Sequence, residues 1–202
     1  MSLPLPNDAQ LDALREVANI GCGHAANALS RLMGGRKVDL SIPRVLQGGP
    51  ADAAGLVDGD APVVASWLGI QGELRGVLLL VLPRADGSAL ESLLLGGHPA
   101  EQAERDSVVS EVANIVASAC LSALGRLTGW KLMPTVPTLR RGVARHAVDL
   151  AVEGVSGDAG DAGRMVVLEA RFQAASVPPV GGQMLLVLER ESSRALLARL
   201  GV

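Results

Sequence analysis

Aromatic residues are almost absent from this chain: they make up 1% of its 202 residues, whereas apolar residues make up 49%. The core must therefore be built from Ala, Leu and Val. Long apolar runs are also missing. The longest, Val77–Leu82, has the length of a strand and falls far short of the roughly 18 residues that span a bilayer. The N-terminus lacks a basic region followed by an apolar one, so we expect no secretory signal, no membrane insertion and a cytoplasmic protein.

Cysteines, basic clusters and grouped histidines are equally sparse. Cys22 and Cys120 both fall within helical patterns, and without an export signal we expect two small buried residues rather than a disulfide. The net charge of −3 and the absence of any basic run argue against nucleic acid as a partner. We expect no metal site, because the three histidines lack the spacing of ligands: His24, His98 and His146.

The most informative feature that is present is an internal repeat. The pentapeptide Glu-Val-Ala-Asn-Ile occurs at 16–20 and again at 111–115, an offset of 95 residues. Further matches keep this offset and then shift to 94, because the first copy carries one extra glycine, Gly35, in a turn. A repeat of such a long period indicates a duplicated structural unit. Residues 1–202 are therefore predicted to form a single domain built of two repeats, at about 8–100 and 103–202.

Gly, Pro and Asp punctuate the chain and predict a similar order of elements in each half. In the first half we expect a helix over 9–33, strands near 38–46, 62–70 and 73–82, and a short helix over 89–95 capped by residues 86–88. In the second we expect a helix over 103–127, β-structure at 134–139, strands near 144–153, 164–173 and 183–189, a hairpin tip at 154–163, and a helix over 192–200. The predicted fold is α+β: a pseudo-twofold duplicated unit whose mainly antiparallel sheet packs against two long helices.

Each long helix has an apolar side and an unusual polar side when placed on a wheel at 100° per residue. The apolar stripes, predicted to be buried, are Leu14, Ala18, Gly21, Ala25, Ala28 and Leu32, and Val109, Ala113, Val116, Cys120, Ala123 and Leu127. The opposite sides are Asp12, Glu16, Asn19, Gly23, Asn27 and Ser30, and Ser107, Glu111, Asn114, Ser118, Ser122 and Gly125. Ordinary solvated faces are rich in long charged side chains. These faces are flat, so the backbone of another protein could approach them closely.

Glu and Asn at i and i+3 project side by side from a helix. A Glu and an Asn that are simply solvated would suit either copy alone. Identical placement in both copies favours a functional pair, because surface residues are free to drift after duplication. The long helices are therefore predicted to carry the sites on their exposed faces.

These faces resemble the signature of the CheC/CheX/FliY phosphatases of bacterial and archaeal chemotaxis: Asp or Ser, three residues, Glu, two residues, Asn, and Pro after a further 22. The second copy fits in full, with Ser107, Glu111, Asn114 and Pro137. The first copy has Asp12, Glu16, Asn19 and Pro43, with 23 residues before the proline. The extra residue, Gly35, lies beyond the predicted helix end. The resemblance covers essentially the whole chain, and two sites without an appended flagellar switch domain make the two-site CheC-type members the nearest match.

The resemblance implies a hydrolase that removes the aspartyl phosphate of the response regulator CheY. In this family the regulator supplies Mg²⁺ and a lysine, so the phosphatase has only to position a water in line with the phosphoryl group. Asn19 and Asn114 would do this, because an amide both donates to and accepts from water without a shifted pKa. Glu16 and Glu111, also implied as catalytic, would pair with the regulator's lysine and fix the docking register.

The resemblance also implies substrate contacts and partners. The contacts are Asp12, Gly23, Ser107 and Ser118. No cofactor is expected on this chain, and a phosphorylated CheY-type regulator is the expected partner of a monomer. The receptor deamidase CheD is a further partner that the family allows. The alternative from another class is a non-catalytic adaptor that binds phosphorylated CheY or CheD, although two Glu–Asn pairs favour catalysis.

Two weaker patterns remain. Residues 21–26 fit the loose Gly-x-Gly fingerprint of dinucleotide-binding proteins, but they lie inside a predicted helix rather than after a strand, which argues against that reading. Trp67 and Trp130 would suit a partner surface or, more simply, the core or its rim.

Overall fold

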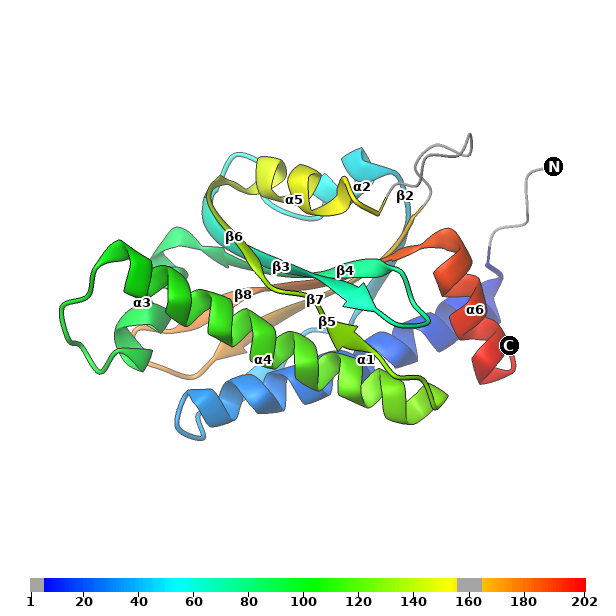
Figure 1. Cartoon of the computed structure of the whole chain (residues 1–202), viewed down its shortest axis with the longest axis horizontal. Helices are drawn as coiled ribbons and strands as arrows, with labels where there is room; N and C mark the ends of the chain where they lie inside the picture. The colour runs from blue at the N-terminus through cyan, green and yellow to red at the C-terminus, as the bar shows by residue number, and fades with distance from the viewer. Residues whose placement is uncertain (1–5, 156–164) are drawn as a thin grey trace.

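The computed structural model describes residues 6–155 and 165–202, which form an eight-stranded sheet with helices on both faces (Figure 1). The first half contains α1 (Asp8–Leu32), β1 (Val38–Leu40), β2 (Arg44–Gly48), α2 (Pro50–Ala54), β3 (Pro62–Gln71), β4 (Gly76–Pro83) and α3 (Arg84–Leu94). The second contains α4 (Gln102–Thr128), β5 (Met133–Pro134), β6 (Thr138–Val143), α5 (Ala144–Val152), β7 (Met165–Ala174), β8 (Val180–Glu189) and α6 (Arg190–Leu200). Helices and strands follow one another in the same order in both halves.

The sheet interleaves the two halves. Its strand order is β1-β7-β8-β4-β3-β5, with β2 also on β7 and β6 also on β3, and the pairings are antiparallel. Each half contributes one long hairpin, β3–β4 or β7–β8, and the hairpins meet where β4 pairs with β8. The short strands of each half pair with the hairpin of the other half. This pseudo-twofold arrangement confirms the predicted α+β fold.

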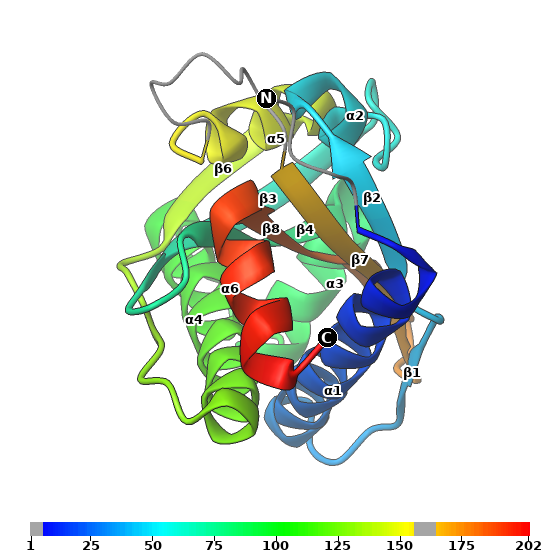
Figure 2. The same ribbon diagram turned by 90° about the vertical axis from the view of Figure 1, so that its right-hand side faces the viewer.

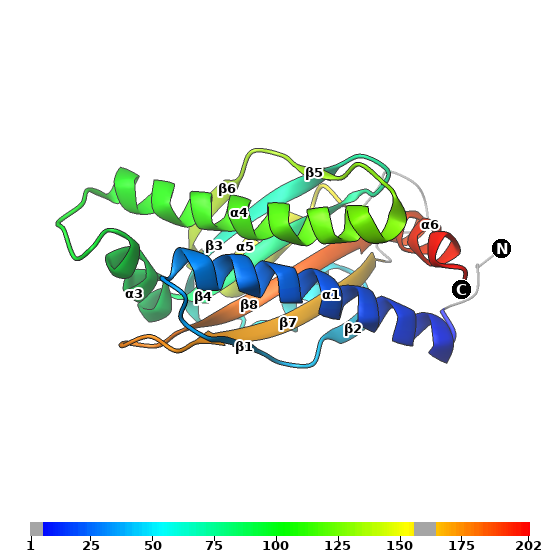
Figure 3. The same cartoon turned by 90° about the horizontal axis from the view of Figure 1, so that it is seen from below.

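The two long helices, α1 and α4, lie side by side on one face of the sheet and run in opposite directions (Figure 3). A Cβ on Gly21 of α1 would lie 2.8 Å from Sγ of Cys120 on α4, so any larger residue at Gly21 would displace this thiol where the helices meet. Both cysteines are free and buried, as predicted. Burial, together with the negative charge of Glu169, raises the pKa of Cys22 to about 11, so its thiol stays protonated at neutral pH. Helices α2 and α5 cover the opposite face of the sheet over a second apolar cluster (Figure 2).

The predicted strand at 144–153 is wrong, because these residues form helix α5. Its buried positions are Ala144, Ala147, Val148, Ala151 and Val152, at the three- and four-residue spacings of a helix that packs one face on a sheet. The valines favour a strand, and the segment begins without a side-chain cap that would mark a helix. Packing against β3 and β4 decides the conformation.

The start of α3 also differs from the prediction. The helix begins at Arg84, so residues 86–88 lie inside it rather than before it. Gly87 is needed there because a Cβ would lie 2.4 Å from Cγ1 of Val64 on β3. The glycine therefore marks a close contact between helix and sheet, not a helix start. The short helix α2 was not predicted at all.

The predicted burial of Leu127 and of the two tryptophans can be compared with the structure, whereas most of the predicted hairpin tip cannot. Leu127, expected in the buried stripe, is 41% exposed, because in the last turn of α4 Thr128 turns inward instead. Trp67 and Trp130 are partly buried against the two apolar clusters, which confirms the core or rim reading. Residues 156–163 of the predicted hairpin tip lie outside the described residues.

Helix α4 is long and apolar enough, by length and composition alone, to cross a membrane: its most apolar window has a mean hydropathy of 1.6. Half of that window is buried inside the fold. Its apolar side contacts α1 and strands β3 and β4, so packing in the core accounts for its composition.

The buried carboxylate of Glu169 links strands β2, β7 and β8 near the edge of the sheet that β1 and β2 form. Glu169 on β7 is 1% exposed and accepts hydrogen bonds from Arg44 Nε at 2.7 Å, Gln183 Nε2 at 2.9 Å and Arg171 Nε at 3.4 Å. Burial alone would raise the pKa of Glu169. The bonds from Arg44 and Gln183 and the charges of both arginines outweigh burial, and the pKa lies below its ordinary value of 4.5.

We expect Glu169→Gln to lower the melting temperature at pH 7, and we expect this difference to shrink in acid. A carboxyl whose folded pKa is depressed stabilises the fold above its unfolded pKa, and that stability is lost as the pH falls through the folded value. Thermal unfolding at pH 7 and at successive values below 4.5 measures the effect. The exposed residue Glu153 offers the matched control, Glu153→Gln. A gap for Glu169→Gln that stays constant into acid would contradict this role.

Candidate functional site

The first Glu–Asn pair lies on the solvent side of α1. Glu16 and Asn19 are exposed, whereas Val17 and Ala18 between them are buried. Positions three apart on a helix have Cβ atoms roughly 5–6 Å apart, so one bound group can touch both side chains. The predicted contact residues lie on the same side. Asp12 accepts a 2.6 Å hydrogen bond from Nη1 of Arg15, and nothing lies within 4 Å of where a Cβ on Gly23 would be.

The second pair lies on α4 in a more sheltered position. Ser107 and Glu111 are exposed, but Asn114 and Ser118 are half-buried, so Asn114 is less exposed than predicted. The chain that follows α4 contacts this helix on its way back toward the sheet. It passes close to Gly125, where a Cβ would lie 2.8 Å from the carbonyl oxygen of Trp130, and then returns along the helix.

The four predicted catalytic residues form two separate pairs. Because α1 and α4 run in opposite directions (Figure 3) and meet at Gly21 and Cys120, their N-terminal halves point away from each other. Asn19 precedes the meeting point by two residues and Asn114 by six, which separates the asparagines by about 12 Å along the helix axes. The glutamates lie farther apart still. Each helix therefore presents its own site.

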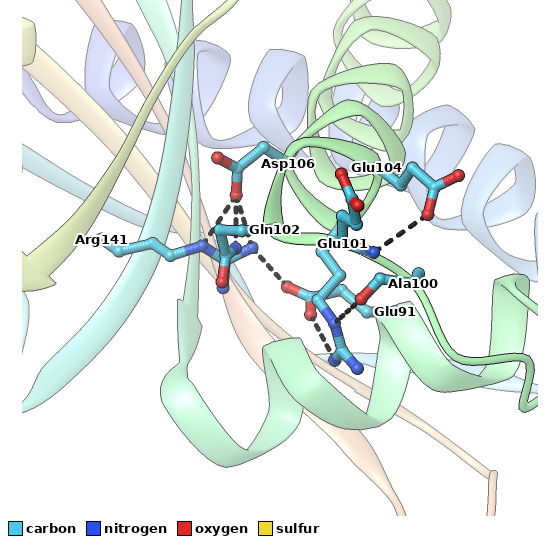
Figure 4. A network of polar contacts seen from close by, with 8 residues as sticks. Glu91, Ala100, Glu101, Gln102, Glu104, Asp106 and Arg141 are labelled. Atoms are coloured by element: carbon cyan, nitrogen blue, oxygen red, sulfur yellow. Dashed lines mark hydrogen bonds and ion pairs between the residues drawn. The ribbon is translucent and has the colours of Figure 1, made fainter.

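An ion network supports the helix that carries the second pair (Figure 4). Glu91 of α3 is buried and binds Nη2 of Arg141 on β6 at 2.7 Å and Nη1 of Arg105 on α4 at 3.4 Å. Nε of Arg141 also donates to Asp106 of α4 at 2.9 Å, and Asp106 accepts from Gln102 at 2.8 Å. Burial would lower the pKa of Arg141, but its bonds to Glu91 and Asp106 raise it overall. The network fixes the first turns of α4 against α3 and β6.

Helix α1 begins in a different way. At the repeat offset, Gln10 and Leu11 stand where α4 has Arg105 and Asp106, so the ionic groups are not repeated at these two positions. Instead, Asn7 caps the helix: its Oδ1 accepts from the Gln10 N–H at 2.9 Å, and the Asn7 N–H donates to Oε1 of Gln10 at 3.1 Å. The two sites thus share their Glu–Asn pair and differ in how their helices are held.

The residue before each signature proline is a feature that was not predicted from the sequence. Ile42 and Val136 are among the most exposed large apolar side chains of the described residues. Their matching positions at the offset of 94 were a usable signal, but exposure cannot be read from a short segment between strands.

The sequence and the fold both match known proteins. Residues 10–46 match the model of the CheC-like family. The CheY-P phosphatase CheC of Bacillus subtilis is 32% identical over 137 residues, which cover 64% of this chain and 65% of that protein, slightly less than two thirds of its length. The structure of FliY from Thermotoga maritima matches with a TM-score of 0.72 at 17% identity, over 98% of both chains. A CheX–CheY–BeF3–Mg²⁺ complex from Borrelia burgdorferi matches with a TM-score of 0.53 at 14% identity, over 87% of this chain and 97% of the matched one. The predicted resemblance to the CheC family is therefore confirmed.

Proposed function

We propose that this CheC-like chain is a protein phosphatase that hydrolyses the aspartyl phosphate of a CheY-type response regulator. The observation that carries the proposal is the repetition of a Glu–Asn pair at equivalent positions of α1 and α4, with both glutamates and Asn19 exposed and Asn114 half-buried. The name of the Bacillus subtilis relative supports the activity, and the complex of CheX with CheY supports the class of partner.

The chemistry requires little of this chain. Transfer of a phosphoryl group to water needs an in-line nucleophile and neutralisation of charge on the phosphoryl oxygens. The regulator brings Mg²⁺ and a lysine beside its own phosphorylated aspartate. Asn19 or Asn114 would hold the attacking water, because the amide oxygen accepts a hydrogen bond from the water while the amide nitrogen can donate one to a neighbouring oxygen.

The glutamates would fix the orientation in which the regulator docks, and with it the position of the water relative to the phosphoryl group. Glu16 or Glu111 would pair with the regulator's lysine, and a charge-assisted hydrogen bond is about twice as strong as a neutral one. Since Glu and Asn stand one turn apart on a rigid helix, docking through the carboxylate brings the amide to the phosphoryl group. Asp12, Gly23, Ser107 and Ser118 would border the same contact. We assign the protein to the cytoplasm as a monomer, with CheD as a second partner.

The direct test is to mix the protein with phosphorylated CheY-type regulator and follow the release of inorganic phosphate. A phosphatase shortens the lifetime of the phosphorylated regulator at substoichiometric concentration. The adaptor alternative predicts binding of the regulator loaded with beryllofluoride, a stable mimic of the phosphoryl group, with no change in that lifetime. An unchanged lifetime therefore contradicts the phosphatase proposal.

We expect the second site to be at least as active as the first. The ion network holds α4 at its start, and Gly129 alone ends it, whereas α1 ends in two glycines with φ angles of 73° and 81°. A less rigid support places the water less well, and loss of positioning lowers the rate. Asn114→Ala should thus reduce turnover by at least as much as Asn19→Ala, measured for both variants on one phosphorylated regulator. A silent Asn114→Ala beside an inactive Asn19→Ala would reverse the ranking.

A further inference from the structure

The residue before each signature proline is an exposed, branched aliphatic side chain. Ile42 is 81% exposed and Val136 is 86% exposed, and the two stand at equivalent positions of the repeat. Single apolar side chains on a surface are common and need no explanation. Two at matched positions, one in each half, point to a shared use.

Both side chains stand on backbone that is fixed to the sheet by the same two hydrogen bonds. The Ser41 N–H donates to the Arg171 carbonyl at 2.8 Å, and Ser41 Oγ accepts from the Arg171 N–H at 2.9 Å. In the other half, the Thr135 N–H donates to the Gly69 carbonyl at 2.9 Å, and Thr135 Oγ1 accepts from the Gly69 N–H at 2.8 Å. We call each of these a hydroxyl clip.

The two clips are equivalent within the fold. Arg171 of β7 pairs with Gln183 of β8, and Gly69 of β3 pairs with Val77 of β4. Gln183 and Val77 stand at matching positions before the repeated Leu-Leu-Val-Leu of these strands. Each half thus presents the same tripeptide geometry: a clipped hydroxyl residue, an outward aliphatic residue and a proline.

This geometry holds the aliphatic side chain ready for contact. A residue before proline is confined to extended conformations, and a β-branched side chain has a stiff χ1. With the preceding residue clipped as well, Ile42 and Val136 lose little conformational entropy when another surface covers them. Binding by a pre-ordered group is stronger because less freedom is lost.

Val136 lies on the segment that runs back along α4, the helix of the second Glu–Asn pair. The chain after α4 starts next to Gly125, where the Trp130 carbonyl lies, and reaches Asp106 through Arg141 of β6. Val136 lies midway along this segment between Trp130 and Arg141, level with the middle of α4, where Asn114 and Ser118 are half-buried.

The first half follows the same course. There Ser30 of α1 donates to the Arg36 carbonyl at 2.6 Å at the start of the return, and β1 then packs along α1. Ile42 follows β1 by two residues, at the position that matches Val136. By the repeat, Ile42 stands relative to Asn19 as Val136 stands relative to Asn114.

We propose that Ile42 and Val136 are docking residues, one for each site, that contact apolar surface of the regulator's receiver domain next to its phosphorylated aspartate. This inference rests on the proposed phosphatase function. The helix faces offer Glu, Asn, Ser and Gly, whose polar groups can orient the regulator but bury little apolar area. Protein interfaces draw most of their affinity from a few well-packed groups at their centre. The two aliphatic residues, on the segments that return along these helices, would supply the missing area.

The test uses variants in which one site alone is active. In the Asn114→Ala background, only the first site works, and Ile42→Ala should raise KM about five- to tenfold with kcat within about twofold, because it removes contact that substrate and transition state share equally. Val136→Ala should have no effect in that background. In the Asn19→Ala background the two variants should exchange roles. The conservative changes Ile42→Val and Val136→Ile should keep KM near that of the parent.

Val177→Ala is the matched control. Val177 is fully exposed but lies in the connection between β7 and β8, beyond Ala174 at the end of β7, and that end is about 10 Å along the strand from Arg171. Affinity for beryllofluoride-loaded regulator should fall in the Ile42→Ala, Val136→Ala double variant and stay unchanged in Val177→Ala. If the protein releases phosphate but both alanine variants keep the parental KM in both backgrounds, this inference is wrong and the phosphatase proposal stands. If the unaltered protein releases no phosphate, the phosphatase proposal fails, and the docking role fails with it.

Discussion

Asn19→Ala combined with Asn114→Ala is expected to abolish phosphate release from the regulator while the fold stays intact. Each amide is proposed to hold the attacking water, and displacement of a reacting group by about 1 Å can lower a rate on the order of 100-fold. Removing both amides should therefore lower turnover at least 100-fold. Neither side chain belongs to the apolar core. Asn19 is exposed and Asn114 half-buried, so the double change should destabilise the fold by no more than about 1 kcal/mol.

Two measurements check this expectation together. Phosphate release over time reports turnover, and thermal unfolding reports the fold. Asn27→Ala is the control, because Asn27 is also an exposed asparagine on α1 but stands two turns beyond Asn19. It should keep most of the parental turnover. A folded Asn19→Ala, Asn114→Ala protein with undiminished turnover would rule out the water-positioning role of the amides.

The positions of the Glu–Asn pairs could be predicted from the sequence because they depend on local geometry. A helix of 25 residues such as α1 repeats its period often enough to define an apolar stripe, and Gly34 and Gly129 end the helices where glycine is expected. The burial of Ala18 beside exposed Glu16 and Asn19 follows from that period alone, whereas the burial of Val17 was not predicted. The internal repeat strengthened the prediction, since the same pair appeared at the same helix position in each half.

The features that could not be predicted depend on contacts between distant residues. Helix α5 was read as a strand because a nine-residue segment is too short for its period to outweigh its valines, and the sheet beneath it decides. The network of Glu91, Arg105 and Arg141 joins three elements whose proximity only the fold determines. The same is true of the hydroxyl clips, which link residues 130 and 66 positions apart. The local sequence pattern thus predicted where the Glu–Asn pairs lie on their helices. The ion network and the hydroxyl clips could not be predicted, because they depend on how the strands of the sheet pair.

Charge reversal at both glutamates, Glu16→Lys together with Glu111→Lys, is expected to prevent productive binding of the regulator. If each carboxylate pairs with the regulator's lysine, the change removes an attractive pair and creates a like-charge contact in its place. Truncating one member of a close interfacial charge pair typically costs 2–5 kcal/mol, and repulsion adds to that loss. We therefore expect affinity for beryllofluoride-loaded regulator to fall at least about 100-fold, measured by titration at fixed salt.

The control must change the net charge equally without touching either face. Glu73 in the β3–β4 turn and Glu153 after α5 are both exposed, and Glu73→Lys with Glu153→Lys alters the net charge by the same amount. That protein should keep affinity within a few fold, because exposed charges far from the contact are screened. Substituting glutamate for the regulator's lysine need not restore activity, since that lysine also serves the phosphoryl group. Parental affinity in the Glu16→Lys, Glu111→Lys protein would show that the glutamates do not dock the regulator, and the register of the water would then have to be set by another group on the same helices.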